Sequence, residues 1–223
     1  RQKNHIISMN NSLVKEYFRA VKEIRPKAFV MENVSMLSSE THRFYDSAKD
    51  HDVVTSLGVQ MREDELVLAD SDYNGYSLVN IIQADAVADY KISDELFQLL
   101  NVLYKNRNSE ERLSKYIKNK SKLIIDKIAS QAEEVKNNLG ILNWIVDMIN
   151  TEQISACFTE LGQFIKFQKT FRLKEELDSN EIIYEIENDL QTGKIIARVK
   201  SYSVIEYVNK ILGDDYKKNS GVI

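Results

Sequence analysis

The chain has 223 residues, of which 43% are hydrophobic and 29% charged, so it is globular and long enough for one ordinary domain and a second small one. A formal net charge of −4 excludes a protein that is basic throughout, so any nucleic-acid contact requires a local basic patch. A single cysteine excludes an internal disulfide, the three histidines lack ligand-like spacing, and no apolar run is long enough to span a membrane. Because the sequence begins at Arg1 and stops at Ile223 inside an expected strand, we expect an excised fragment.

The N-terminal part predicts a helix followed by a buried strand. Residues 11–25 place apolar side chains on one face at helical spacing, and Pro26 ends the helix. The run Ala28–Met31 is uninterrupted and apolar, which is typical of a strand buried on both faces of a parallel sheet. A helix, a tight turn and a buried strand make half of a βαβ unit, so this region predicts an α/β sheet. The residues of the helix face are Leu13, Val14, Tyr17, Phe18, Val21 and Ile24.

The middle of the chain predicts a mainly helical region. After an acidic stretch with a loop at residues 70–75, Ser93 is expected to cap a helix. A long helix at residues 109–139 is expected to end at Gly140. Two further helices are expected at residues 141–149 and 151–171.

A β-hairpin and a last helix are predicted near the C-terminus. Apolar and charged residues alternate in Glu181–Glu187 and again in Lys194–Lys200, with turn-forming residues between them. Ser203 is expected to cap a helix at Val204–Leu212, and a strand is expected to begin near Tyr216.

One short motif has the residue types and the position of a reactive site. Glu32-Asn33-Val34 follows the expected buried strand, and open α/β sheets bind ligands at the carboxyl ends of their strands. The stretch NNSLVKEYFRAVKEIRPKAFVMENVSML resembles the segment of DNA cytosine-5 methyltransferases that ends in their Glu-Asn-Val motif. The early Leu13, Pro26, the apolar run at 28–31 and Glu32–Val34 all correspond to that segment.

A second stretch resembles the same family. The sequence VIEYVNKILGDDYKKNSGVI is similar to the helix-Gly-strand segment that precedes the Gln-x-Arg-x-Arg motif in these enzymes. The two stretches cover residues 8–38 and 201–223 and occur in the family's order, whereas the interval between them resembles nothing in the family.

The resemblance implies a mechanism for methyl transfer. Such an enzyme flips the target cytosine out of the duplex, a cysteine thiolate attacks C6, and C5 takes the methyl group of S-adenosylmethionine. Glu32 would activate the base at N3, and burial at the end of the strand is expected to raise the pKa of this carboxyl. Asn33 would hold the local backbone, and Val34 would line the pocket for the base.

Other parts of the family's active site are missing from this chain. No Pro-Cys dipeptide occurs, and Cys157 lies in an apolar helical context that predicts an inert core residue. The Gly-rich loop that binds S-adenosylmethionine, the Gln-x-Arg-x-Arg motif and a target-recognition domain are also absent. We therefore expect the fragment alone to be inactive, with S-adenosylmethionine bound mainly by parts outside it.

The predicted fold class is α/β, with a partial Rossmann-like methyltransferase sheet interrupted by a mainly helical insertion that carries the hairpin. Residues 1–38 and 201–223 would belong to the catalytic domain, and residues 39–200 would form the insertion. The resemblance implies double-stranded DNA as the partner, no membrane contact, a possible restriction endonuclease partner system, and the cytoplasm of a bacterial or archaeal cell.

Basic residues in two places are candidates for contact with DNA phosphate. His42 and Arg43 follow the Glu-Asn-Val motif, and Arg112, Lys115 and Lys118 lie in the expected long helix. A solvated helix face is the favoured alternative for the helix residues, because the basic run at 112–122 does not share one side, and a solvated loop is the favoured alternative for His42. An alternative for the whole chain is a non-enzymatic helical module that binds protein or DNA, in which both resemblances are accidental.

Overall fold

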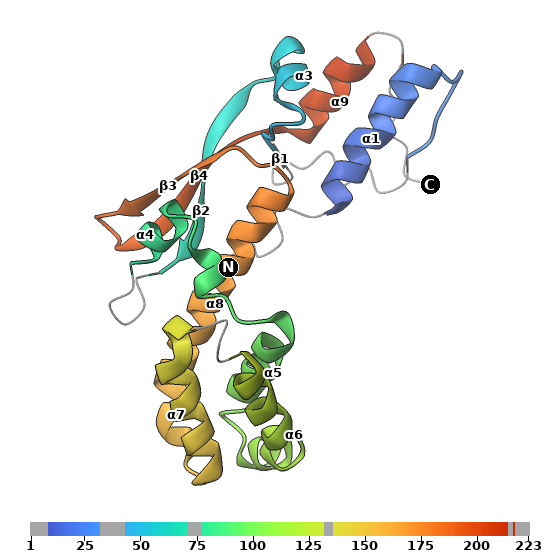
Figure 1. Ribbon diagram of the computed structural model, residues 1–223. Coiled ribbons are helices and arrows are strands. Elements are labelled where there is room, and N and C mark those ends of the chain that lie inside the picture. The colour runs from blue at the N-terminus through green and yellow to red at the C-terminus, as the bar shows by residue number, and fades with distance from the viewer. Residues whose placement is uncertain (1–8, 32–42, 71–76, 132–135, 214–215, 217–223) are drawn as a thin grey trace. The chain divides into compact units, whose positions relative to one another are not determined.

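The computed structural model describes residues 9–31, 43–70, 77–131, 136–213 and 216 (Figure 1). The chain divides into two compact units. The first, here called the terminal unit, comprises Arg1–Leu66, Glu175–Glu185 and Ala197–Ile223. The second, the helical unit, comprises Val67–Lys174 and Ile186–Ile196.

A four-stranded antiparallel sheet contains every strand of the described chain. Its order is β1-β4-β2, and β3 also pairs with β4. Phe44 of β1 lies opposite Tyr202 of β4. The strands are β1 (Arg43–Tyr45), β2 (Met61–Ala69), β3 (Tyr184–Asp189) and β4 (Lys194–Ser203). The structure thus confirms an α/β composition, while it does not confirm a Rossmann-like sheet.

The hairpin is confirmed, and a neighbouring strand was missed. β3 and β4 are joined by a tight turn that ends at Gly193. The missed strand, β2, carries three consecutive acidic residues and lacks a clean apolar alternation. Its exposed Glu63 and Glu65 pair with Arg198 of β4 at 3.5 and 3.0 Å, so both acidic residues face one arginine on β4.

Helix α1 (Met9–Ile24) confirms the first predicted helix. Phe18 and Val21 are buried, whereas Leu13 and Ile24, which the pattern assigns to the same face, are exposed. α1 packs against α9 (Val204–Leu212), while Leu13 and Ile24 lie outside the core of this unit. The two helices run beside each other in Figure 1.

Helix α9 confirms the last predicted helix and its cap. The Ser203 hydroxyl accepts a hydrogen bond from the Glu206 N–H, and Gly213 follows the helix with a φ of +60°. The expected strand near Tyr216 lies largely outside the described residues. The core of the terminal unit consists of Phe18, Val21, Phe44, Val54, Val59, Tyr202, Val204, Tyr207, Val208, Ile211 and Leu212.

The prediction of a strand at residues 28–31 is wrong. These residues adopt neither helix nor strand, and the Val30 side chain is 82% exposed. Phe29 and Met31 pack against the core of the terminal unit. A strand buried on both faces needs a paired strand and a covering layer on each side, and the described part of the chain covers one side of this segment.

The middle of the chain contains the predicted helices, with changes at their ends: the helix expected at 109–139 is described only to Gln131, and the helix expected at 151–171 begins at Phe158. Gly140 does not end a helix but lies in the first turn of α7, and α8 continues beyond Phe171 to Ser179, since residues 172–178 are good helix formers. Ser93 caps α5 as expected. The helices of this part of the chain are α4 (Leu78–Gln83), α5 (Asp94–Lys105), α6 (Glu110–Gln131), α7 (Leu139–Asn150) and α8 (Phe158–Ser179). Short 3-10 turns lie at Val87–Asp89, Lys136–Asn138 and Ile154–Cys157. Over the described residues, no helix has both the length and the apolarity needed to cross a membrane.

Candidate functional site

The predicted site residues are divided between described and undescribed parts of the chain. Glu32, Asn33, Val34 and His42 lie outside the described residues. The described residues before this motif end at Met31, and the described residues after it begin at Arg43.

The segment that leads to Glu32 is residues 26–31, here called the approach segment. Arg25 adopts a left-handed φ of 48°, and Pro26 has no N–H to continue the helix, so the chain leaves α1 at this point. The segment then lies beside α1, as the hydrogen bond from the Tyr17 hydroxyl to the Val30 carbonyl at 3.1 Å shows. The approach segment is therefore tied to the helix that precedes it.

An aromatic cluster holds the approach segment from its inner side. The Phe29 ring makes edge contacts with Tyr17 and Phe18, both at 6.1 Å between ring centroids, and with Tyr216 at 5.1 Å. The Tyr216 hydroxyl donates to the Pro26 carbonyl at 2.8 Å. Sequence reasoning assigned Tyr17 to the helix face and missed both hydroxyl contacts, because their carbonyl partners are 13 and 190 positions away along the chain.

Arg43 lies at the other side of the undescribed segment and is built into the sheet. Its guanidinium donates to the Ser201 hydroxyl at 2.8 Å and to the Ser201 carbonyl at 2.9 Å, with Asp64 at 3.9 Å. Its side chain is only 12% exposed. This geometry gives Arg43 a role in joining β1 to β4, and its contact with DNA phosphate stays a prediction.

Beside β1, a lysine of α1 joins two parts of the terminal unit. The Lys15 ammonium lies 2.5 Å from the Asp50 carboxylate and over the rings of Phe44 and Tyr202, at 5.0 and 5.4 Å from their centroids. Burial raises the pKa of Tyr202, whose hydroxyl has no hydrogen-bond partner among the described residues. The lysine therefore positions α1 against the sheet.

A buried carboxylate directly follows β1 in the sequence. Asp46 is 1% exposed and its Oδ2 lies 2.8 Å from Nδ1 of His51. Within the described ranges, no group of histidine, cysteine, aspartate and glutamate side chains could hold a metal ion. The pair therefore connects the residues after β1 to α3 (His51–Ser56).

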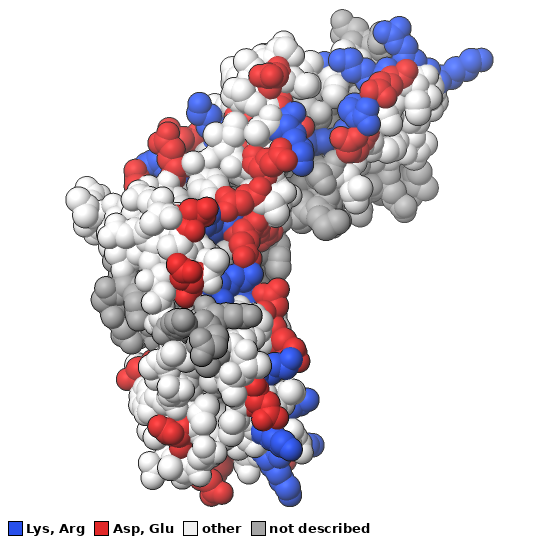
Figure 2. Space-filling model, viewed as in Figure 1, with Lys and Arg blue, Asp and Glu red and all other residues white. Residues whose placement is uncertain are grey.

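Basic residues on α6 form a stripe on the helical unit. Arg112, Lys115, Lys118 and Lys122 are all exposed and recur every three or four positions, which places them on one side of a continuous helix. Lysine and arginine side chains gather at the lower right of Figure 2, where Figure 1 shows α6, with acidic side chains among them. The stripe is available to an anionic partner.

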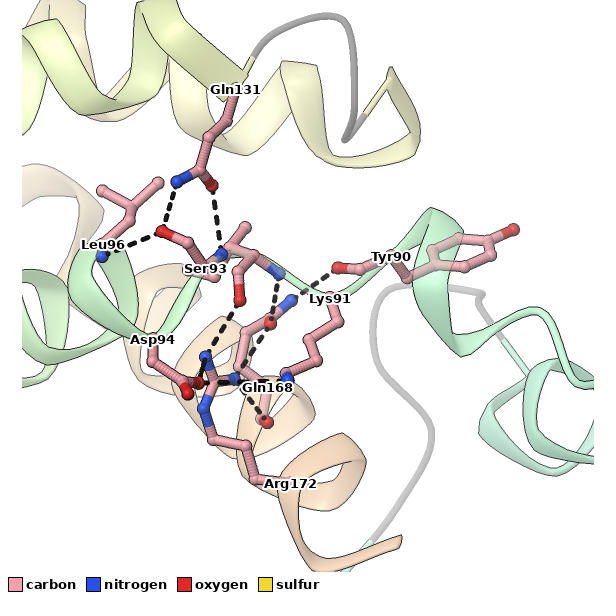
Figure 3. Close-up of polar contacts among 9 residues, drawn as sticks. Tyr90, Lys91, Ser93, Asp94, Leu96, Gln131, Gln168 and Arg172 are labelled. Atoms are coloured by element: carbon pink, nitrogen blue, oxygen red, sulfur yellow. Dashed lines mark hydrogen bonds and ion pairs between the residues drawn. The ribbon is translucent and has the colours of Figure 1, made fainter. Parts of the chain in front are cut away.

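A buried polar network fastens the chain before α5 to α8 and α6 (Figure 3). The fully buried Gln168 side chain accepts from the Ile92 N–H at 3.0 Å and donates to the Tyr90 carbonyl at 2.8 Å. Arg172 donates to the Ile92 carbonyl at 2.9 Å, and Gln131 accepts from the Ser93 N–H at 3.1 Å. These contacts satisfy backbone groups that would otherwise be buried without partners, so they organise the helical unit.

Cys157 is confirmed as a buried core residue. Its thiol donates to the Ile154 carbonyl at 3.2 Å, and burial raises its pKa to about 11. The thiolate is the nucleophilic form of cysteine, so this side chain is poorly suited to attack on a base.

Together these features define an α/β protein in which a helix, a turn and an aromatic-anchored segment lead directly to a Glu-Asn-Val motif. Residues 2–56 match the family model described as C-5 cytosine-specific DNA methylase, a range that includes α1, the approach segment, the motif, β1 and α3. The match confirms the resemblance of residues 8–38 and supports membership of the chain in the cytosine-5 methyltransferase family. The resemblance of residues 201–223 lies outside the matched range and stays a prediction. No curated protein matches the chain, and no solved structure does.

Proposed function

We propose that this chain is part of an enzyme that transfers the methyl group of S-adenosylmethionine to C5 of a cytosine flipped out of double-stranded DNA. The observation that carries the proposal is that the family match falls on the segment that contains the Glu-Asn-Val motif. The anchored approach segment supports it, because a catalytic side chain needs a backbone that is held in place.

Glu32 is the proposed catalytic residue. Attack of a thiolate on C6 places negative charge on the ring, and a carboxyl that donates a proton or hydrogen bond to N3 stabilises that charge. Asn33 would maintain the local backbone and Val34 would line the base pocket. The nucleophile would come from another part of the protein, since the one cysteine of this chain is buried with a raised pKa.

S-adenosylmethionine is proposed as the cofactor of the whole enzyme. No Gly-rich loop follows a strand in the sequence, so the cofactor would be bound mainly outside this chain, and the chain alone would be inactive. Residues 1–38 and 201–223 would belong to the catalytic domain and residues 39–200 to an insertion. A cytoplasmic location and a partner restriction endonuclease belong to the same proposal.

Methyl transfer by the intact protein tests the proposal directly. Duplex DNA incubated with the protein and S-adenosylmethionine labelled in its methyl group should acquire label at C5 of cytosine, located by nucleoside analysis of the digested DNA. DNA that stays unlabelled, or labelled only on another atom, would contradict the proposed reaction.

The α6 stripe is proposed to contact DNA phosphate. Replacing Arg112, Lys115 and Lys118 together with alanine is expected to weaken DNA binding by the intact enzyme. The logarithm of the DNA-binding constant falls linearly with the logarithm of the salt concentration, and each lost phosphate contact should make this slope shallower by about 0.9. Fluorescence anisotropy at several salt concentrations measures both quantities.

Two single variants provide the matched comparison. Lys118 and Lys120 are both exposed on α6 but lie on different sides of the helix. Lys118→Ala should reduce affinity and Lys120→Ala should not. Equal affinities for wild type and the triple variant would mean that the stripe is a solvated surface.

A further inference from the structure

We propose that the end of α5 and the exposed strip of α8 form a second site for the phosphate backbone of duplex DNA, here called the α5–α8 site. Its cations are Lys105 of α5 and Lys166 and Lys169 of α8, so it shares no residue with the α6 stripe. All of them belong to the helical unit. The inference rests on the proposed function only for the identity of the polyanion.

The two lysines of α8 stand on a narrow exposed strip of a helix that is otherwise buried here. From position 161 to position 171 every residue is buried except Gln163, Lys166 and Lys169. Lys166 and Lys169 are neighbours on the helix surface, because residues three positions apart face the same side. Like charges at this spacing destabilise a helix, so the pair needs a reason other than stability.

Tyr104 brings the end of α5 to the same part of α8. A Cβ at position 162 would lie 2.6 Å from the Tyr104 hydroxyl oxygen, so the phenol packs directly against the α8 backbone at Gly162. Lys105 follows Tyr104 in the chain and is exposed. Lys166 is one helical turn beyond Gly162, about 6 Å along the axis. This packing places a lysine of α5 beside the lysines of α8.

The charges of the three lysines are not neutralised by the protein. Partial burial lowers the pKa of Lys169, and the charges of Lys105 and Lys166 lower it further. Neither Lys105 nor Lys169 forms an ion pair with a described residue, while Lys166 pairs with Asp70 at 3.5 Å. Both members of that pair are exposed, so it contributes little. A phosphate bound among the ammonium groups would offset their repulsion and release counterions from the DNA.

Arg107 adds a fourth cation at the end of α5. Its guanidinium lies over the Tyr104 ring, with Cζ 4.0 Å from the ring centroid, and donates to the Tyr104 carbonyl at 3.0 Å. It forms no ion pair within the described part of the chain. The stacked guanidinium is restrained before any ligand binds, so less conformational entropy would be lost on contact with a phosphate.

Lys169→Gln in the intact protein is expected to weaken binding of a fluorescein-labelled DNA duplex about five- to tenfold at about 0.1 M salt, as the loss of one phosphate contact. The slope of the logarithm of the binding constant against the logarithm of the salt concentration should become shallower by about 0.9. The loss should be the same for two duplexes of unrelated sequence, because phosphate contacts carry no sequence information. Fluorescence anisotropy measures all three.

Lys120→Gln is the matched control. Lys120 is also an exposed lysine of the helical unit without an ion pair among the described residues, and its replacement removes the same charge. Its affinity for DNA should equal that of the wild type. Equal affinities for Lys169→Gln and Lys120→Gln would overturn the α5–α8 site.

Two further measurements separate a binding role from a structural one. Lys105→Gln should weaken DNA binding as Lys169→Gln does, and a silent Lys105→Gln would contradict a site built from both helices. Because each variant removes one of three repelling charges, neither melting temperature should fall. A lower melting temperature for Lys169→Gln would assign this lysine a structural role and count against the site.

Methyl transfer by the wild-type protein, measured separately, distinguishes failure of this inference from failure of the proposed function. An active enzyme whose Lys169→Gln variant binds DNA normally would refute the site and leave the function intact. A protein that binds DNA through Lys105 and Lys169 but transfers no methyl group would refute the function and leave the site intact.

Discussion

Glu32→Gln in the intact enzyme is expected to lower kcat for methyl transfer by about 10²- to 10⁴-fold, which is the usual contribution of a general acid or base. The amide has nearly the same shape as the carboxyl and can still accept a hydrogen bond, but it cannot supply a proton to N3 of the cytosine. Negative charge on the ring would then remain unneutralised when the thiolate attacks C6. Methyl incorporation into duplex DNA under single-turnover conditions measures the effect on the chemical step.

Glu23→Gln is the control for this substitution. This variant carries the same carboxyl-to-amide change on the exposed face of α1, where Glu23 pairs with Arg19 at 2.6 Å. An exposed ion pair of this kind contributes little to stability, so both activity and melting temperature should stay at wild-type values. The non-enzymatic helical module predicts instead that Glu32→Gln is as silent as Glu23→Gln, and that result would favour it over the enzyme.

Gln168→Leu is expected to destabilise the helical unit by about 1–3 kcal/mol. Leucine has a similar volume but cannot accept the hydrogen bond of the Ile92 N–H, and Ile92 is 1% exposed, so water cannot replace the lost partner. For a chain of this size the melting temperature would fall by about 2–4 °C for each kcal/mol. Chemical denaturation followed by circular dichroism gives the free energy of unfolding.

Gln163→Leu makes the same chemical change five positions earlier in α8. Gln163 is exposed, so its replacement should alter the free energy of unfolding by no more than about 0.5 kcal/mol. If Gln163→Leu destabilises the protein as much as Gln168→Leu does, the network in Figure 3 is not the cause of the loss.

The sequence alone predicted the elements whose signals are local. Helices α1 and α9 follow from apolar spacing, and Ser93 and Ser203 cap their helices through hydroxyls that reach N–H groups three residues onward. The β3–β4 hairpin follows from alternation on both sides of a turn. The residues of the Glu-Asn-Val segment also identified the family, which the match over residues 2–56 supports.

Predictions that depended on neighbours distant in sequence were less successful. The run at residues 28–31 has the composition of a buried strand, yet such a strand forms only where other strands pair with it, and none does so in the described chain. Strand β2 was missed because its acidic residues do not alternate cleanly with apolar ones. Glu63 and Glu65 have a place in the sheet because both pair with Arg198 of β4. In both cases the partner strand determines the outcome.

What the sequence by itself determined is therefore the set of local helices, their caps, the hairpin and the motif that points to methyl transfer. Only the tertiary structure decided how the approach segment is held, because the Tyr216 hydroxyl and the Pro26 carbonyl are separated by 190 positions. It likewise decided that Gln168 binds Tyr90 and Ile92. Hydrogen-bond partners and burial depend on which segments pack together, and spacing along one segment carries no information about that.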